Sequence, residues 1–155
     1  MAGRKSIMIA IGCDHGGFAL KEEIKKYLDK KGVEYKDFGC YNEESCDYAF
    51  AAQKVGLAVT GGECELGLLF CGTGIGISMA ANKVKGVRAA ACSDYFSAKF
   101  TRLHNDANIL CLGGRVVGAG LAEEMVEVFL NTQFEGGRHA RRVDQIHRIE
   151  AGEIL

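Results

Sequence analysis

The sequence has no proline, no dominant charge and no long hydrophobic run, and these absences exclude several classes of protein. Its 19 Lys+Arg and 20 Asp+Glu nearly cancel to a net charge of −1, so there is no electrostatic argument for a nucleic acid or membrane partner. The first apolar run covers only residues 7–11 and soon meets Asp14 and His15. This run is typical of a first strand, not of a signal peptide or a membrane span. We therefore expect a cytoplasmic protein.

Repeats, low-complexity stretches and linkers are missing as well. A chain of 155 residues, 48% of them hydrophobic and 25% charged, has the size and composition of one globular domain. We expect a single domain over residues 1–155, with a C-terminal helix at about 139–151 that packs on a partner subunit.

Signatures of disulfides and of metal binding are also missing. The seven cysteines are odd in number, form no CxxC pair, and four of them lie on or at the ends of apolar runs, at positions 13, 71, 92 and 111. We expect reduced thiols in a cytoplasmic protein. The four histidines show no metal-ligand spacing, so we expect no metal site.

Apolar, strand-like runs alternate with helical patterns along the whole chain. The strand-like runs are 7–12, 33–38, 66–71, 87–92 and 109–113. Five such units separated by helices predict an α/β fold, a Rossmann-like three-layer sandwich with a five-stranded parallel sheet. We expect the flavodoxin-like strand order 2-1-3-4-5, in which strands 1 and 3 are neighbours at the switch point.

Two glycine-rich segments follow these two neighbouring strands. Strand 1 ends in CDHGG (13–17) and strand 3 in CGTGIG (71–76), which runs directly into a helix. Ligands of such sheets bind beyond the carboxyl ends of the strands, and bare amides at a helix N-terminus favour an anion. The loop is neither a GxGxxG dinucleotide fingerprint nor a Walker A loop. A thiol that faces this helix N-terminus is favoured as a thiolate, which suits a base or a nucleophile.

Each candidate residue also has a purely structural interpretation when it is viewed alone. Cys71 is then a packed thiol at a strand end, and Asp14 caps the first helix. The pair Arg138 and Arg142, one helical turn apart, is a solvated basic face, or else binds one phosphate. His104 is part of a polar turn, and Tyr48 belongs to the core.

Taken together, the motifs resemble one family. They are GCDHGGFALK, the DY pair at 47–48, CGTGIGISMAANK, RLHNDAN and EGGRHARRV, in this order. The chain is similar to type B ribose-5-phosphate isomerases and the related galactose-6-phosphate isomerase subunits, from Ile7 to about Glu150. Another branch of that family carries a glutamate in the glycine loop where this chain has Ile77, so the resemblance is to the cysteine branch.

The resemblance implies an aldose–ketose isomerase of the pentose phosphate pathway, without cofactor or metal, that works through an enediolate. By match, Cys71 is the base that moves a proton between C2 and C1 of the sugar, and His104 is the acid that assists ring opening. Asp14 and Thr73 assist them. The substrate-binding positions implied by the resemblance are Asp14, His15, Tyr48, Gly72, Thr73, Gly74, Ile75, Gly76, Asn105, Arg115, Arg138 and Arg142. Among these, His15 and the two C-terminal arginines hold the phosphate.

Topology predicts that this site is shared between two chains. Cys71 ends strand 3, whereas His104 follows the fourth helix and precedes strand 5. The two residues therefore lie beyond opposite ends of the parallel strands. A strand of ordinary length separates those two ends by ~17–20 Å. We therefore expect a homodimer with shared active sites, or a tetramer built from it. Two alternatives remain, namely an isomerase of galactose or allose 6-phosphate and a non-catalytic sugar-phosphate or nucleotide-binding module.

Overall fold

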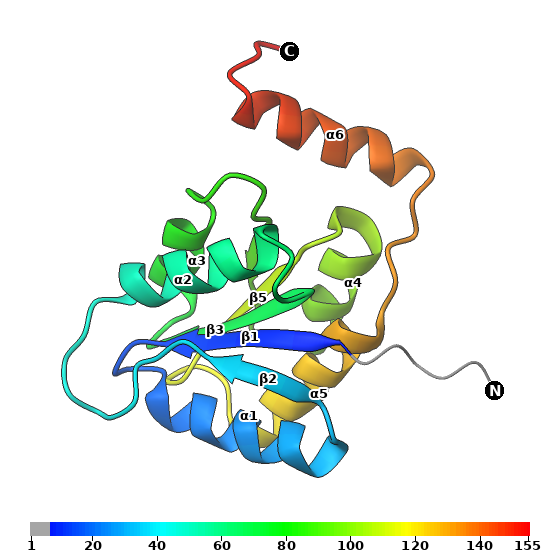
Figure 1. Ribbon diagram of the computed structural model, residues 1–155. Helices are drawn as coiled ribbons and strands as arrows, with labels where there is room; N and C mark the ends of the chain where they lie inside the picture. The colour runs from blue at the N-terminus through cyan, green and yellow to red at the C-terminus, as the bar shows by residue number, and fades with distance from the viewer. Residues whose placement is uncertain (1–6) are drawn as a thin grey trace.

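The computed structural model describes residues 7–155, which form a parallel sheet between two layers of helices (Figure 1). The strands are β1 (Met8–Cys13), β2 (Glu34–Asp37), β3 (Leu66–Cys71), β4 (Ala89–Ala91) and β5 (Ile109–Gly113). The helices are α1 (Phe18–Lys31), α2 (Tyr48–Thr60), α3 (Ile75–Ala81), α4 (Tyr95–Asn105), α5 (Ala119–Asn131) and α6 (Arg138–Glu150). The predicted three-layer α/β sandwich with five parallel strands is confirmed.

The alternation of side chains along the central strands builds two separate cores. Leu68 and Phe70 of β3 point to the face that is covered by α1, α4 and α5, where Phe129 of α5 is fully buried. Leu69 and Cys71 point to the opposite face, which is covered by α2 and α3. All six residues of β3 are buried, because helices cover both of its faces.

The strand order differs from the predicted one at one edge. The order is β2-β1-β3-β5-β4, so β5 pairs with β3 and β4 lies at the edge. The reason is burial. The strand β5 (ILCLG) is buried throughout and fits the centre of the sheet, whereas β4 has only three residues, all partly accessible. The neighbouring strands at the switch point, β1 and β3, are those that were predicted.

The expectation of reduced cysteines is wrong for one pair. Cys40 and Cys46 form a disulfide across the loop between β2 and α2. The five other cysteines are free and buried, as expected for small core side chains. The sequence did not predict this pair because its spacing matches no common motif. The two sulfurs meet only through the fold of this loop.

Helix α6 extends away from the sheet at the end of a long segment (Figure 1). Only His139 and Val143 of this helix are buried, while Ile146 and Ile149 are exposed. Within residues 7–155, no helix combines the length and the hydrophobicity needed to cross a bilayer.

Candidate functional site

The loops after β1 and β3 are in direct contact. The N–H of Asp14 donates a hydrogen bond to the carbonyl of Phe70 over 3.1 Å. A side chain at Gly16 would place its Cβ 2.9 Å from the backbone nitrogen of Gly72, so the two loops approach this closely only because Gly16 lacks one. The predicted convergence of the two glycine-rich segments is thus observed.

Cys71 lies at the centre of this contact and is only 4% exposed. The N–H of Gly74 donates to its sulfur over 3.0 Å. Gly74 begins α3 with a φ of +80°, and a Cβ there would lie 2.9 Å from the carbonyl carbon of Leu112. Glycine is therefore required twice at this position, by backbone conformation and by space. Its conformation directs an amide N–H at the sulfur.

The other free cysteines lie in a different environment. Burial raises the pKa of Cys13 and of Cys92 to about 11, and it also raises the pKa of Cys64 and Cys111. These thiols stay protonated near neutral pH and serve as core side chains.

Three exposed polar side chains surround the glycine loop. The hydroxyl of Thr73 accepts a hydrogen bond from the N–H of Ile75 over 3.1 Å. A Cβ at Gly72 would lie 3.1 Å from a guanidinium nitrogen of Arg115, and one at Gly76 would lie 2.9 Å from the ring of Tyr48. Arg115 and Tyr48 thus occupy the space beside Gly72 and Gly76, which a side chain at either glycine would need.

Asp14 and His15 lie in the loop after β1, on the other side of the contact with the glycine loop. Asp14 is 7% exposed, and its Oδ1 accepts from the N–H of Gly17 over 3.1 Å. Gly17, not Asp14, is the N-cap residue of α1, so the simple capping interpretation of Asp14 is wrong. His15 is exposed, with its Nδ1 3.3 Å from the backbone nitrogen and oxygen of Cys46. The disulfide loop therefore contacts the histidine that was predicted to bind phosphate.

The remaining predicted site residues lie at the opposite end of the sheet. His104 and Asn105 end α4 and precede β5, whose first residue, Ile109, pairs with Gly67, while its last, Gly113, pairs with Cys71. Four steps along the strand separate these two ends by about 13 Å. Arg138 and Arg142 are exposed on α6, which contacts α4. One chain therefore presents two separate groups of predicted site residues.

The second group contains two side chains that the sequence analysis did not single out, Glu135 and His139. The rings of His104 and His139 stack with their centroids 4.0 Å apart, and one carboxylate oxygen of Glu135 lies 3.5 Å and 3.8 Å from the Nε2 atoms of these rings. Burial, and then the charges of His104 and Arg138, lower the pKa of His139. The two histidines are separated by 34 residues, so no short-range spacing rule could have predicted this arrangement.

Lys21 is a further residue whose role the sequence did not indicate. Its side chain is fully buried, and its ammonium donates to both carboxylate oxygens of Asp37, at 2.9 Å each, and to the carbonyl of Cys40. A lysine within an amphipathic helix normally faces solvent. Here it ties α1 to the end of β2 and to the disulfide loop that contacts His15.

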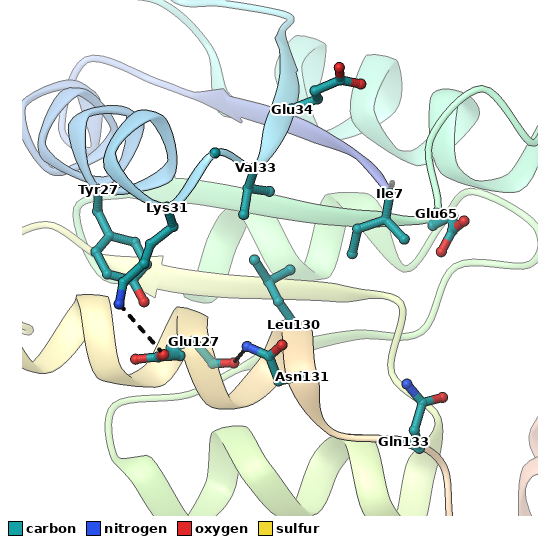
Figure 2. A pocket seen from close by; sticks show the side chains of 11 residues that line it. Ile7, Tyr27, Lys31, Val33, Glu34, Glu65, Glu127, Leu130, Asn131 and Gln133 are labelled. Atoms are coloured by element: carbon teal, nitrogen blue, oxygen red, sulfur yellow. Dashed lines mark hydrogen bonds and ion pairs between the residues drawn. The ribbon is translucent and has the colours of Figure 1, made fainter. Parts of the chain in front are cut away.

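One cavity of the described residues lies away from Cys71. It has a volume of about 600 Å³ and lies at the amino ends of β1 and β2, between α1 and α5 (Figure 2). Its polar lining includes Lys31 and Glu127, which lie 4.0 Å apart, and it contains no cysteine or histidine. The thiol with a directed amide N–H, Cys71, does not line this cavity.

The comparisons with known proteins show the family of this chain. Residues 9–146 match the family model described as Ribose/Galactose Isomerase. The chain is 53% identical to ribose-5-phosphate isomerase B of Escherichia coli over 142 residues, which cover 92% of this chain and 95% of that one. It is 40% identical to D-erythrulose-4-phosphate isomerase of Pectobacterium atrosepticum, over 95% of this chain and 97% of that one.

A solved structure gives the same result for the fold. The ribose-5-phosphate isomerase B of Clostridium thermocellum superimposes with a TM-score of 0.93 at 53% identity, and the match covers 94% of this chain and 99% of that one. The family-model match includes both glycine-rich loops and α6 up to residue 146. This chain therefore belongs to the ribose/galactose isomerase family.

Proposed function

We propose that the chain interconverts D-ribose 5-phosphate and D-ribulose 5-phosphate, with Cys71 as the base. The observation that carries this proposal is the hydrogen bond from the N–H of Gly74 to the sulfur of Cys71, at the contact between this loop and the loop that holds Asp14. The relative from Escherichia coli and the structure from Clostridium thermocellum, each 53% identical, both carry the name of this isomerase.

The chemistry needs one group that moves a proton between two adjacent carbons. The thiolate of Cys71 takes the proton from C2 of the open-chain aldose, and the electron pair forms the C1–C2 double bond of an enediolate. The same sulfur then returns the proton to C1 while the proton of the O2 hydroxyl moves to O1, so the ketose forms without an external oxidant or reductant. A base of this kind contributes typically 10²–10⁴-fold to the rate.

The glycine loop stabilises the charge that develops during this transfer. The amides of residues 72–76 lie just before and at the start of α3, where the first N–H groups have no intrahelical partner and the helix dipole is positive. They form an oxyanion hole for the enediolate, an interaction worth about 3–4 kcal/mol per donor in well-studied enzymes. Thr73 and Asp14 flank the reacting carbons, and Tyr48 and Arg115 close the crevice.

Ring opening and phosphate binding require the second group of residues. The sugar enters as a ring. His104, which is next to Asn105, is the acid that assists opening of this ring. Arg138 and Arg142 bind the phosphate together with His15, in the charge-assisted manner typical of guanidinium groups. Because His104 and the arginines lie beyond the opposite end of the sheet from Cys71, a second copy of the chain supplies them.

The exposed face of α6 supports a homodimer of this kind. Ile146 and Ile149 are 46% and 59% exposed on a helix with few contacts to its own sheet. An apolar stripe of this kind is stabilised when it packs on a partner. A twofold axis would bury the same face twice and would complete two identical sites, each with one Cys71 and one His104 from different chains.

An isomerisation assay with several sugar phosphates tests the function. We expect formation of ribulose 5-phosphate from ribose 5-phosphate with excess chelator present, and slower turnover of galactose 6-phosphate, allose 6-phosphate and D-erythrulose 4-phosphate. Faster turnover of one of these would reassign the substrate. Tight binding of ribose 5-phosphate without any turnover would instead favour the non-catalytic binding module.

A further inference from the structure

Three side chains with metal-binding atoms meet beside the end of α4. His104 comes from the last turn of α4, Glu135 from the segment before α6, and His139 from the first turn of α6. One ligand atom from each lies within 4.8 Å of the others, and the carboxylate oxygen of Glu135 is 3.5 Å from Nε2 of His104 and 3.8 Å from Nε2 of His139. The imidazole rings are stacked and nearly parallel, with an interplanar angle of 10°.

The backbone holds this cluster in place. The N–H of Glu135 donates to the carbonyl of Leu103 over 3.0 Å, and the N–H of His139 donates to the carbonyl of Gly136 over 3.1 Å. The ring of Phe100 packs edge-on against His104, with the centroids 5.0 Å apart. His139 is only 6% exposed. The backbone of Glu135 and His139 and the ring of His104 are therefore held close together before an ion binds, and rotation of the side chains directs their ligand atoms at it.

Two imidazoles and one carboxylate are a ligand set of zinc. With bonds of ~2.0–2.2 Å in a tetrahedral arrangement, neighbouring ligand atoms are ~3.3 Å apart. The two distances from the Glu135 carboxylate, 3.5 and 3.8 Å, are already close to this value. The accessible side of His104 and Glu135 leaves the fourth position to water. Arg138 and Arg142 act on His139 electrostatically and oppose a dication, so we expect weaker binding than at a structural zinc site.

We propose that His104, Glu135 and His139 form a reversible binding site for Zn²⁺ and similar divalent transition ions, and that its occupation inhibits the isomerase. The ion would bind the imidazole of His104 and remove it from proton transfer. The binding half of this proposal rests on the geometry of the cluster alone. The inhibitory half rests on the proposed function of His104.

Metal binding is tested first without reference to activity. The Cys71→Ala variant removes the one free thiol that has an amide donor, and it is titrated with Co²⁺ by visible absorption and with Zn²⁺ by calorimetry. We expect one ion per chain, and affinity lower by at least about 10-fold when Glu135→Gln or His139→Gln is added, since a direct ligand is lost. Glu124→Gln, an exposed carboxylate on α5, is the matched control and leaves the affinity unchanged. No binding, or equal binding in all variants, would overturn the site.

Inhibition is then measured in chains with an intact Cys71, each relative to its own metal-free rate. Zn²⁺ should inhibit the wild type, EDTA should restore its rate, and Glu135→Gln and His139→Gln should each need at least about 10-fold more zinc. Zinc that binds the cluster without inhibiting would overturn the regulatory half. A wild type without isomerase activity at any metal concentration would overturn the proposed function, and the binding titration would still decide the metal site. Circular dichroism verifies that each variant is folded.

Discussion

The N–H of Gly74 donates a hydrogen bond to the sulfur of Cys71 over 3.0 Å, at the point where β3 ends and α3 begins. This one contact joins the end of a buried strand to the N-terminus of a helix. It places the thiol where an anionic intermediate would also be stabilised. One loop can therefore serve both the base and the enediolate.

Replacement of Cys71 by alanine should lower kcat by about 10²–10⁴-fold, because the proton then has no acceptor. Ribose 5-phosphate should still bind, since the arginines and the loop amides remain. Cys92→Ala is the matched control, because Cys92 is also a buried cysteine that follows a strand, and this variant should keep its activity. If Cys71→Ala kept more than about a tenth of the wild-type kcat, another group would have to be the base.

Replacement of Arg142 by alanine should raise KM for ribose 5-phosphate by about 10- to 100-fold, since a charge-assisted bond to phosphate is lost. Arg138→Ala should act in the same direction. Arg141→Ala removes the same charge from the next position of α6 and is the control. Turnover of unphosphorylated ribose should not change in any of the three. An equal loss on both sugars would contradict the assignment to phosphate.

Mixing of two inactive variants should restore activity if the site is shared between chains. Cys71→Ala and His104→Ala are dissociated reversibly, combined in equal amounts and reassociated. Half of the dimers are then mixed, and each mixed dimer has one site with both lesions and one intact site. About a quarter of the wild-type activity should return.

Subunit exchange in this mixture is followed by native mass spectrometry of differently tagged chains. Each variant dissociated and reassociated alone is the control and should stay inactive. Absence of recovery despite proven exchange would place the whole site within one chain, or would remove His104 from the mechanism.

The ion pair of Lys21 and Asp37 should make stability depend on acid pH. Burial by itself raises the pKa of Asp37, but hydrogen bonds from Lys21, Gly39 and Lys25 outweigh it and lower this pKa below the ordinary value of an aspartate. The stabilisation is therefore fully present above about pH 4 and is lost as the pH falls through the folded-state pKa.

Asp37→Asn should reduce the free energy of unfolding at neutral pH by about 3–5 kcal/mol, because Lys21 stays buried without its counter-ion. In this variant the free energy of unfolding should also fall less steeply below pH 4 than in the wild type, as measured by urea denaturation at several pH values. Asp144→Asn, an exposed carboxylate on α6, should match the wild type. If the free energy of unfolding of Asp37→Asn fell as steeply below pH 4 as that of the wild type, other carboxylates would be responsible for the acid sensitivity.

The sequence by itself determined the features that depend on local order along the chain. The run 66–71 became β3 with the predicted bounds, because six consecutive apolar residues suit a strand covered on both faces. The glycine loop that follows had to turn into a helix at Gly74, where only glycine fits. The contact between the loops after β1 and β3 followed from the rule that parallel strands end at one edge.

Only the tertiary structure decided which distant segments meet. The apolar runs around β4 and β5 look alike in sequence, and burial in the assembled sheet, not local pattern, placed β5 in the centre. The same holds for the Cys40–Cys46 disulfide and for the contact of Glu135 with His104 and His139. Propensity and periodicity act over a few residues, whereas these pairings depend on how whole elements pack, and no spacing rule encodes that.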